Sequence, residues 1–535
     1  MEPTGLPMDS SVPSPAAESS LYYNTPPSEA LDFMQFPGMN FDFTGMGSSA
    51  PTDLAVAYPT PQTAPVHPDD IMDFQMLENF QLPPRHILVQ LFGLFFENLG
   101  HMFPCFHKKS FMVKVECGDM ETDAPLLLYA ICSVTARYHP DDSVKECGKY
   151  WYEQARFSYE LTRRRPDPGL RTLQVALLLV FHASTIGDFS SSWLFLGKAW
   201  RQVVVLGMNR MDVSHAYMLE RSERETAVER EEYRRALWLL FIMDRAHAWP
   251  TGWPNTIPEI QFMVNIPVSD TQFQNMEAGM ETSVHEHTPF TRDLESLVSS
   301  SPTAKEPLNI FHYITVAHVL LGRVSELVHS LHNLPDTVEY ANDCTKLDDL
   351  LVKFRLSLPR QASSVLEASP ADRGHVVWLQ VTLNVVAIML HYRYSQNDQV
   401  SGANPKFALA VLAAGNIAQI IKDASRISTD LLLSVHIASA LYVAACVLVM
   451  QWRLTGDRSL REDIDLFRLV FERMDEVFTF LGMKFKVALE HDLKKSKEDL
   501  ISLQERGLRG LLGDCQKWTH VKQEVQRRGI DIDVT

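Results

Sequence analysis

One uninterrupted apolar run, residues 236–243 (ALWLLFIM), constrains the fold of this chain more than any other feature. A helix that is apolar on every face has to be covered by protein on every face. Arg234 and Arg235 directly precede the run, and Asp244 and Arg245 directly follow it. We therefore predict a helix in the centre of the core with charged residues at both of its ends.

Asp244 needs a partner in such a position, because a buried carboxylate without one costs several kcal/mol or takes up a proton. Arg234 lies about 15 Å away along the helix axis, at about 1.5 Å per residue, which is too far for a pair within the helix. We expect a cation or a backbone donor from a neighbouring element to bind Asp244, and we interpret the flanking charges as groups that orient the helix ends. Pro250 is predicted to end the helix, and Gly252 to permit the turn.

The chain from Pro83 onward has a helical pattern throughout. Residues 87–99, for example, place apolar side chains along one stripe of a helix that stops at Gly100. No series of alternating strands with turn dipeptides is found, so the predicted fold class is all-α. Further helices are predicted at residues 124–137, 150–163, 170–185, 191–206, 232–249, 308–334, 376–393, 405–424, 429–452, 460–481 and 485–511.

This pattern divides the chain into a disordered acidic N-terminal tail, residues 1–82, and a large irregular multi-helix domain, residues 83–535. Residues 265–307 of the domain are polar and lack a period. They are therefore predicted to form a mobile loop ahead of a C-terminal helical half, residues 308–535.

The tail carries most of the net charge. Residues 1–80 hold eleven acidic residues and no Lys or Arg, which is −11 of the net charge of −17. Segments 31–43 and 69–82 interleave carboxylates with Phe, Met and Leu, a composition typical of disordered activation segments. An acidic leader without a partner remains the alternative, and segment 69–82 also suits a first helix of the folded domain. The candidate activation contacts are Phe33, Phe36, Phe41, Phe43, Ile71, Phe74, Leu77 and Phe80.

Charge and motifs argue against several classes of function. A negative net charge is the wrong sign for a protein that coats a nucleic-acid backbone, so any DNA contact has to come from a local patch or a partner. The seven cysteines form no CxxC pair, and phosphate-binding, nucleophile-elbow and HExxH motifs do not occur. We therefore predict no catalytic residues, no cofactor and no metal site, and we do not expect an enzyme.

The weaker patterns have structural interpretations. Residues 285–287 (HEH) lie in the predicted loop without a fixed third ligand, and His329 and His332 suit a polar helix face or a satisfied core position. The basic runs at residues 163–165 and 494–497 suit solvated helix surfaces, with nuclear import as the alternative.

The uncharged run at residues 431–450 is long enough to span a bilayer. Against a membrane span stand His436 within the run, its alanines and serines, and the absence of a Lys/Arg-rich loop beside it. We predict a buried core helix and no membrane partner.

Four segments together resemble a known family. The run "EEYRRALWLLFIMDRAHAWPTGWPNTI" followed by "VNIPVSD" looks like the signature of the middle homology region of fungal transcription factors. Residues 91–112, 126–138 and 192–210 are similar to its opening helix and Phe-Pro-x-x-His loop, its second helix and the helix before the signature. The resemblance covers residues 85–270 well, and Trp253 departs from it because the family commonly has arginine there. We call the following the signature residues: Arg234, Arg235, Trp238, Asp244, Arg245, Gly252 and Pro254.

The resemblance implies a nuclear, non-enzymatic transcriptional regulator. That family's DNA-reading module needs paired cysteine clusters around a binuclear zinc centre, and residues 1–104 contain no cysteine. We therefore expect the chain to reach DNA through a DNA-binding transcription factor as its partner and to recruit activation machinery through its tail. A fungal metabolic or secondary-metabolite gene cluster is the setting that the family suggests, and a homodimer or heterodimer stays open.

Two alternatives remain open at this point. One is a ligand-sensing or scaffolding helical protein without transcriptional activity. The other is a chain whose zinc cluster is encoded in an upstream exon.

Overall fold

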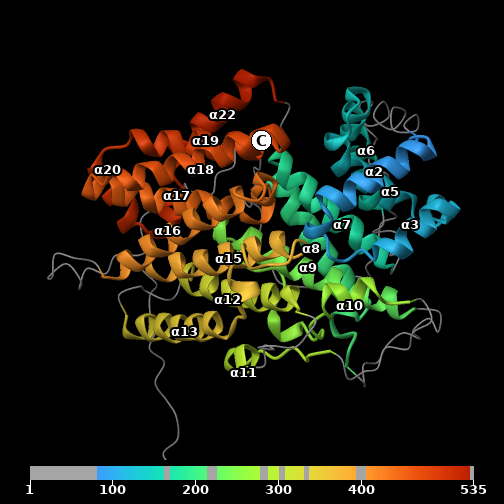
Figure 1. Ribbon diagram of the computed structural model, residues 1–535, viewed down its shortest axis with the longest axis horizontal. Helices are drawn as coiled ribbons and strands as arrows, with labels where there is room; N and C mark the ends of the chain where they lie inside the picture. Colours follow the sequence, from blue (N-terminus) through green and yellow to red (C-terminus); the bar gives the residue numbers. More distant parts are fainter. Residues whose placement is uncertain are drawn as a thin grey trace, which may run out of the picture. The chain divides into compact units, whose positions relative to one another are not determined.

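The structure is a computed structural model that describes residues 81–161, 169–213, 226–277, 287–299, 308–330, 337–392 and 405–530. These residues belong to one compact unit, Thr63–Ile532. They form α-helices and short 3-10 helices, and the only β-pairing among them is an isolated bridge between Ile266 and Thr288 (Figure 1). The predicted all-α fold is confirmed. The eight candidate activation contacts lie outside the described residues.

The helices follow one another closely along the chain. Those of the first half are α2 Arg85–Asn98, α3 Lys108–Cys117, α4 Asp119–Asp123, α5 Pro125–Thr135, α6 Asp142–Leu161, α7 Leu170–Ile186, α8 Phe189–Val205, α9 Ala227–Thr251, α10 Asp270–Gln274 and α11 Leu294–Ser299. Those of the second half are α12 Ile310–Val328, α13 Val338–Ser357, α14 Arg360–Ser363, α15 Arg373–His391, α16 Pro405–Ser425, α17 Val435–Thr455, α18 Arg458–Val477, α19 Thr479–Lys494, α20 Lys497–Glu505, α21 Gly507–Leu512 and α22 Cys515–Arg528. One 3-10 helix, η6 Met208–Arg210, is used below.

Helix α9 packs at the centre of the first half. It contacts α7, α8 and α12, and α12 in turn contacts α15. Helix α15 also packs against α16 and α17, and Figure 1 shows α12, α15, α16 and α17 lying one beside the next. All residues of the apolar run 236–243 are buried, as the sequence predicts. The core is therefore continuous from α9 into the C-terminal half.

Within the part of the chain that the structure describes, three helices are long and apolar enough, by length and composition alone, to cross a membrane: Arg373–His391, Lys406–Ser425 and Val435–Thr455. In the most apolar 18-residue stretch of each helix, the buried share is 83%, 44% and 72%, respectively. Helix α17, which contains most of the uncharged run 431–450, contacts α15, α16, α18, α19 and α20. Protein thus covers α17 in the way that a central apolar helix requires.

The sequence pattern does not predict α3, α13 or α22. Only Phe111 and Val115 are buried in α3, and only Leu351 and Phe354 in α13. So few buried side chains leave no regular apolar stripe, which is the signal that the predicted helices carry.

The single helix predicted at residues 485–511 is wrong, because the structure places α19, α20 and α21 there. Ser496 caps α20 by accepting a hydrogen bond from the Asp499 amide at 3.1 Å. Gly507 has a φ of +72°, a left-handed conformation that glycine adopts without strain. These two features divide a continuous apolar pattern.

The prediction that Pro250 ends the central helix is also wrong. Helix α9 continues through Pro250 to Thr251, whose hydroxyl donates to the His247 carbonyl oxygen at 2.8 Å. Gly252 then ends the helix with a φ of +70° and donates its N–H to the Ala248 carbonyl oxygen at 2.9 Å. The predicted turn at Gly252 is present, and it lies at the helix C-cap.

The predicted loop at residues 265–307 contains more structure than its polar composition indicates. Helices α10 and α11 both form within it, and they bury Phe273 and Leu297 completely. A few well-spaced apolar side chains therefore anchor this segment. Residues 278–286 and 300–307 of the predicted loop lie outside the described residues.

Two buried histidines of α12 are expected to link stability to pH. His312 and His318 are each 1% exposed, and burial lowers the pKa of both from 6.5 to about 4. His318 Nδ1 donates to the Ile314 carbonyl oxygen at 2.8 Å, and its ring packs edge-on against Trp378 with the centroids 5.5 Å apart. Both histidines are therefore neutral parts of the core.

Between pH 6.5 and about 4 these histidines are neutral in the folded protein and protonated in the unfolded chain. The free energy of unfolding should thus fall as the pH falls through this window, by up to about 1.4 kcal/mol per pH unit for each histidine. We predict that His318→Gln reduces this slope in urea unfolding measured at several pH values. His86→Gln, at an exposed position, should leave the slope unchanged, and equal slopes for wild type and His318→Gln would contradict the assignment.

Candidate functional site

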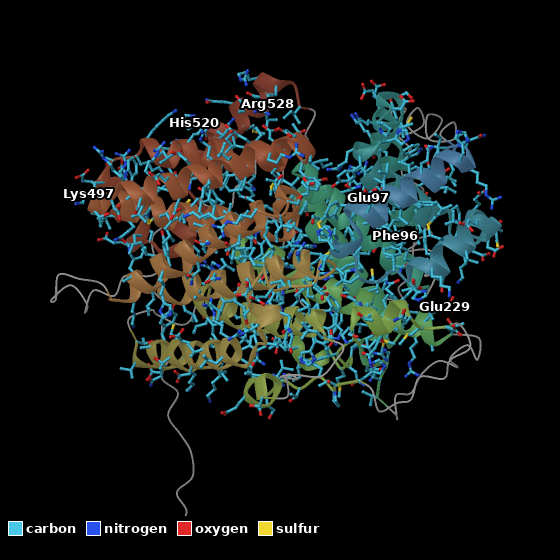
Figure 2. All side chains as sticks on the ribbon, viewed as in Figure 1. Phe96, Glu97, Glu229, Lys497, His520 and Arg528 are labelled. Carbon is cyan, nitrogen blue, oxygen red and sulfur yellow. The ribbon has the colours of Figure 1, made fainter. Side chains whose placement is uncertain are left out.

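The candidate site is helix α9 with the segment that follows it, because the signature residues lie there. The helix begins with a capping box, in which the Thr226 hydroxyl accepts from the Glu229 amide and the Glu229 carboxylate accepts from the Thr226 amide. Glu229, labelled in Figure 2, also binds Lys114 of α3 at 2.9 Å. These contacts fix the N-terminal end of α9 ahead of its buried charges.

Arg234 binds Asp212 through two hydrogen bonds, from Nη2 to Oδ1 at 2.6 Å and from Nε to Oδ2 at 3.1 Å. Its Nη1 also contacts Glu231, one turn earlier in α9. Burial opposes ionisation of Asp212, but Arg234 outweighs it, so the pKa of this carboxyl lies below its ordinary value. Asp212 in turn accepts from the Asn265 amide at 2.9 Å. Arg234 thereby attaches α9 both to the turn after η6 and to the segment before α10.

Arg235 is completely buried and joins three separate segments. Its Nη1 donates to the Pro104 carbonyl oxygen at 3.1 Å and to Asp270 Oδ1 at 2.5 Å. Its Nη2 donates to the Val268 carbonyl oxygen at 2.5 Å, and the guanidinium lies 4.3 Å from the centroid of the Phe273 ring. The side chain therefore connects α9 to the loop before α3 and to the first turn of α10.

Two buried acidic residues of α9, Glu231 and Glu232, complete this end of the site. Glu231 Oε1 accepts from the Val268 amide at 3.0 Å, and Glu232 Oε1 accepts from the His107 amide at 2.9 Å. Burial raises the pKa of Glu232, and Arg171 of α7, 3.2 Å away, opposes that rise. The sequence does not single out either carboxylate, because the amides that they bind are brought near only by folding.

At the other end of α9, Asp244 accepts hydrogen bonds from the backbone amides of Thr256 at 2.9 Å and Ile257 at 3.1 Å. Arg245 Nη1 lies 2.5 Å from Asp244 Oδ2. These contacts supply both kinds of partner that a buried carboxylate needs at this position. Asp244 therefore holds the chain in place where it turns back along α9.

Arg245 fills a space that α12 leaves open for it. Its Nη2 donates to the Ile257 carbonyl oxygen at 2.8 Å, and its guanidinium lies 3.9 Å from the centroid of the Phe241 ring. A Cβ atom added at Gly322 of α12 would lie 2.8 Å from Arg245 Nε. Glycine at this position thus allows α12 to approach α9 closely.

Trp238 anchors the segment that runs back along α9. Its Nε1 donates to the Asn265 carbonyl oxygen at 2.8 Å. Its ring packs edge-on against Phe262 and Phe290, with centroids 4.7 Å and 5.2 Å away. A largely apolar side chain therefore also supplies a specific polar contact.

Gly252 lies where the C-terminal half reaches α9. A Cβ atom at Gly252 would meet His329 Nδ1 at 3.3 Å and Arg509 Nε at 3.4 Å. His329 Nε2 donates to the Trp249 carbonyl oxygen at 2.8 Å, and Arg509 of α21 binds the His329 carbonyl oxygen. His329 is thus a hydrogen-bonded core histidine, as one of the two sequence interpretations predicts.

The remaining residues that the sequence singles out range from exposed to buried. Pro254 is exposed, and the Trp253 ring packs against Trp193 with the centroids 5.3 Å apart. His287 Nδ1 lies 3.9 Å from Glu231 Oε2. The following lie outside the described residues: His285, Glu286, His332 and residues 163–165.

The arrangement gives the signature charges a structural role. Each of them binds an opposite charge, a backbone group or both, and such buried pairs fix geometry when all partners are present. Charges that are engaged in this way hold connecting segments in place and are poorly suited to proton transfer or nucleophilic attack.

Residues 92–320 match the fungal specific transcription factor domain. This segment of the chain is therefore similar to that domain. The resemblance seen in the signature segments is confirmed, and the match extends past residue 270 into α12.

Similarity also extends to curated fungal proteins. The Zn(2)-C6 fungal-type transcription factor FTF1c of Fusarium oxysporum f. sp. lycopersici is 27% identical over 254 residues, which are 45% of this chain and 26% of that protein. The uncharacterized transcriptional regulatory protein C1683.13c of Schizosaccharomyces pombe is 31% identical over 172 residues, 31% of this chain and 27% of that protein. The matched segments thus span less than a third of the length of either relative.

We predict that Asp244→Ala lowers the free energy of unfolding by about 3–5 kcal/mol, because it leaves Arg245 buried without its opposite charge. Urea unfolding followed by circular dichroism measures the change. The matched control is Asp343→Ala, which removes an exposed pair with Lys346 and should change stability by less than about 1 kcal/mol. Similar small effects for both substitutions would show that Asp244 does not hold the end of α9.

Two glycines in helices should respond to alanine in opposite directions. Gly322→Ala is expected to destabilise the domain, because its Cβ would displace the buried Arg245 side chain. Gly415→Ala in α16 should stabilise it by up to about 1 kcal/mol, since nothing lies within 4 Å of the added Cβ and alanine favours helix. Thermal unfolding of the two variants tests this, and stabilisation by both would exclude a close approach of α12 to Arg245.

Proposed function

We propose that this chain is a non-enzymatic transcriptional regulator that acts in the nucleus. The observation that carries the proposal is the match of residues 92–320 to the fungal specific transcription factor domain. Curated relatives named as a transcription factor and as a transcriptional regulatory protein support it. In this proposal the helical domain is the regulatory part and binds partner proteins.

Residues 1–82 are proposed to recruit the activation machinery. Their first eighty residues carry −11 of the net charge, and their Phe, Met and Leu side chains alternate with carboxylates. Repulsion between carboxylates keeps such a segment solvated, while its aromatic side chains remain able to enter a partner's groove. This composition supports an activating role.

Contact with DNA is proposed to come through a partner that is a DNA-binding transcription factor. The printed sequence contains no CxxC pair, and its net charge is −17. The missing pair argues against a zinc-cluster DNA-reading module in these residues, and the negative net charge argues against strong binding to phosphates. A fungal metabolic or secondary-metabolite gene cluster is the setting that we propose for this regulation.

The activation claim is tested with residues 1–535 fused to a heterologous DNA-binding domain in a reporter strain. We predict activation that falls strongly when Phe33, Phe36, Phe41 and Phe43 are replaced by Ala, and again when Ile71, Phe74, Leu77 and Phe80 are replaced. The physical reason is the loss of the apolar side chains that enter the partner's groove.

The control replaces Leu54, Val56 and Tyr58 by Ala. These apolar residues do not alternate with carboxylates, since the only carboxylate beside them is Asp53. This variant should keep wild-type activation at equal protein level. Silence of the unsubstituted fusion would remove the activation claim and favour a ligand-sensing or scaffolding protein. Equal loss in the control would show that the interleaved pattern has no special role.

A further inference from the structure

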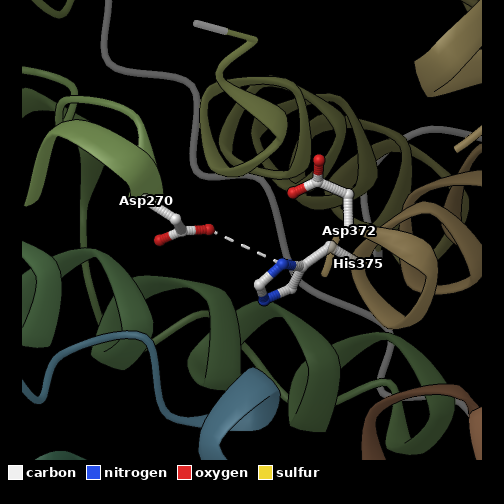
Figure 3. A group of neighbouring side chains, drawn as sticks. All are labelled: Asp270, Asp372 and His375. Atoms are coloured by element: carbon white, nitrogen blue, oxygen red, sulfur yellow. Dashed lines mark ion pairs between the residues drawn. The ribbon is translucent and has the colours of Figure 1, made fainter. Parts of the chain in front are cut away.

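Three possible metal ligands from two distant parts of the chain meet beside the buried end of α9. Asp270 is the first residue of α10, and Asp372 and His375 lie at the start of α15 (Figure 3). One side-chain ligand atom from each residue lies within 4.8 Å of the other two. Among the described residues, no other group brings three such atoms together.

The hydrogen bonds of His375 determine which of its ring nitrogens carries the proton. Nε2 lies 2.7 Å from the His101 carbonyl oxygen, and a carbonyl oxygen only accepts, so Nε2 carries the hydrogen. The neutral ring then presents a lone pair at Nδ1. That atom is buried without a hydrogen-bond partner, and it faces Asp270 Oδ2 at 3.6 Å.

A lone pair that faces a carboxylate across this distance is unfavourable unless a positive charge lies between them. A proton on Nδ1 would form an ion pair between His375 and Asp270, but it would not explain why Asp372 also lies there. A metal cation would use all three residues. The presence of Asp372 at the same point therefore favours the cation.

In each of the two carboxylates, one oxygen accepts a hydrogen bond, and the second oxygen can bind a metal ion. Asp270 Oδ1 accepts from Arg235 Nη1 at 2.5 Å, and its Oδ2 faces His375. Asp372 Oδ2 accepts from the Ser369 hydroxyl at 2.7 Å, and its carboxylate makes no capping bond to α15. Metal ligands are commonly oriented by further hydrogen bonds of this kind. Here the second nitrogen of the imidazole binds a carbonyl oxygen, and each carboxylate accepts a hydrogen bond.

We propose that Asp270, Asp372 and His375 bind one divalent first-row transition-metal cation of the Zn²⁺ class. An imidazole ligand favours this class over Mg²⁺ and Ca²⁺, which prefer oxygen ligands alone. The bound cation connects the first turn of α10, and through Arg235 also α9, to the start of α15. It therefore ties the fungal transcription factor domain to the C-terminal half and makes their connection depend on metal supply.

The test uses the full chain, stripped with a chelator and titrated with Zn²⁺ under reducing conditions at neutral pH. Calorimetry should give one tight site, and the thermal unfolding midpoint should rise until that site is filled. Asp372→Asn and His375→Gln should each weaken binding by at least about 10-fold, since loss of even a supporting residue has an effect of that size. Mg²⁺ at the same concentration should not raise the midpoint.

The matched control is His391→Gln. His391 Nε2 lies 3.0 Å from Asp348 Oδ1, which is a histidine–carboxylate pair outside the three-residue group. This variant should bind Zn²⁺ as the wild type does. No tight site in the wild type, or binding that survives both ligand substitutions, overturns the proposal, because surviving binding places the ion on other groups. Circular dichroism confirms that each variant folds, and if Asp372→Asn does not fold, the comparison of His375→Gln with His391→Gln decides.

Discussion

The structure depends on the neutralisation of charges that α9 carries into the core. An unpaired buried charge costs several kcal/mol, so each of these groups has to meet its partners when the chain folds. Some partners lie within α9 or on neighbouring helices, and others are backbone groups of connecting segments, whose path along α9 these contacts fix. The buried charges are Glu231, Glu232, Arg234, Arg235, Asp244 and Arg245.

The pairing of the buried charges of α9 also indicates that these residues have a structural role. The signature charges are engaged in contacts that hold connecting segments in place, and we propose that recruitment lies in residues 1–82 and partner binding in the helical domain. The proposed cation site extends the same network, since Asp270 binds Arg235 through one oxygen and faces His375 through the other. In this account the proposed cation would strengthen the electrostatic contact between α10 and the start of α15, and so the connection between the two halves.

Sequence and structure agree where neighbouring residues in the sequence are enough to show what a side chain requires, such as burial or a hydrogen-bond donor. The apolar run 236–243 predicts a buried helix, and its position beside Asp244 predicts a donor from another element. The partners themselves are not predictable in this way, because Asp212 and the backbone amides near residue 268 come close to α9 only in the folded chain. The meeting of Asp270 with His375, 105 residues later in the sequence, has no local pattern at all. The prediction that Pro250 ends the helix failed because a proline in the last turn removes only one backbone N–H, and α9 ends one residue later at Thr251.

The central claim is that the charges of α9 are structural pairs, and a double-mutant cycle between Arg234 and Asp212 tests it most directly. Arg234→Met, Asp212→Asn and the double variant are compared with the wild type by urea unfolding. The account predicts a coupling energy above about 1 kcal/mol, whereas the exposed pair Lys353 and Glu295 should couple by at most about 1 kcal/mol and by less than Arg234 with Asp212. Effects of Arg234→Met and Asp212→Asn that add to within about 0.5 kcal/mol would contradict it.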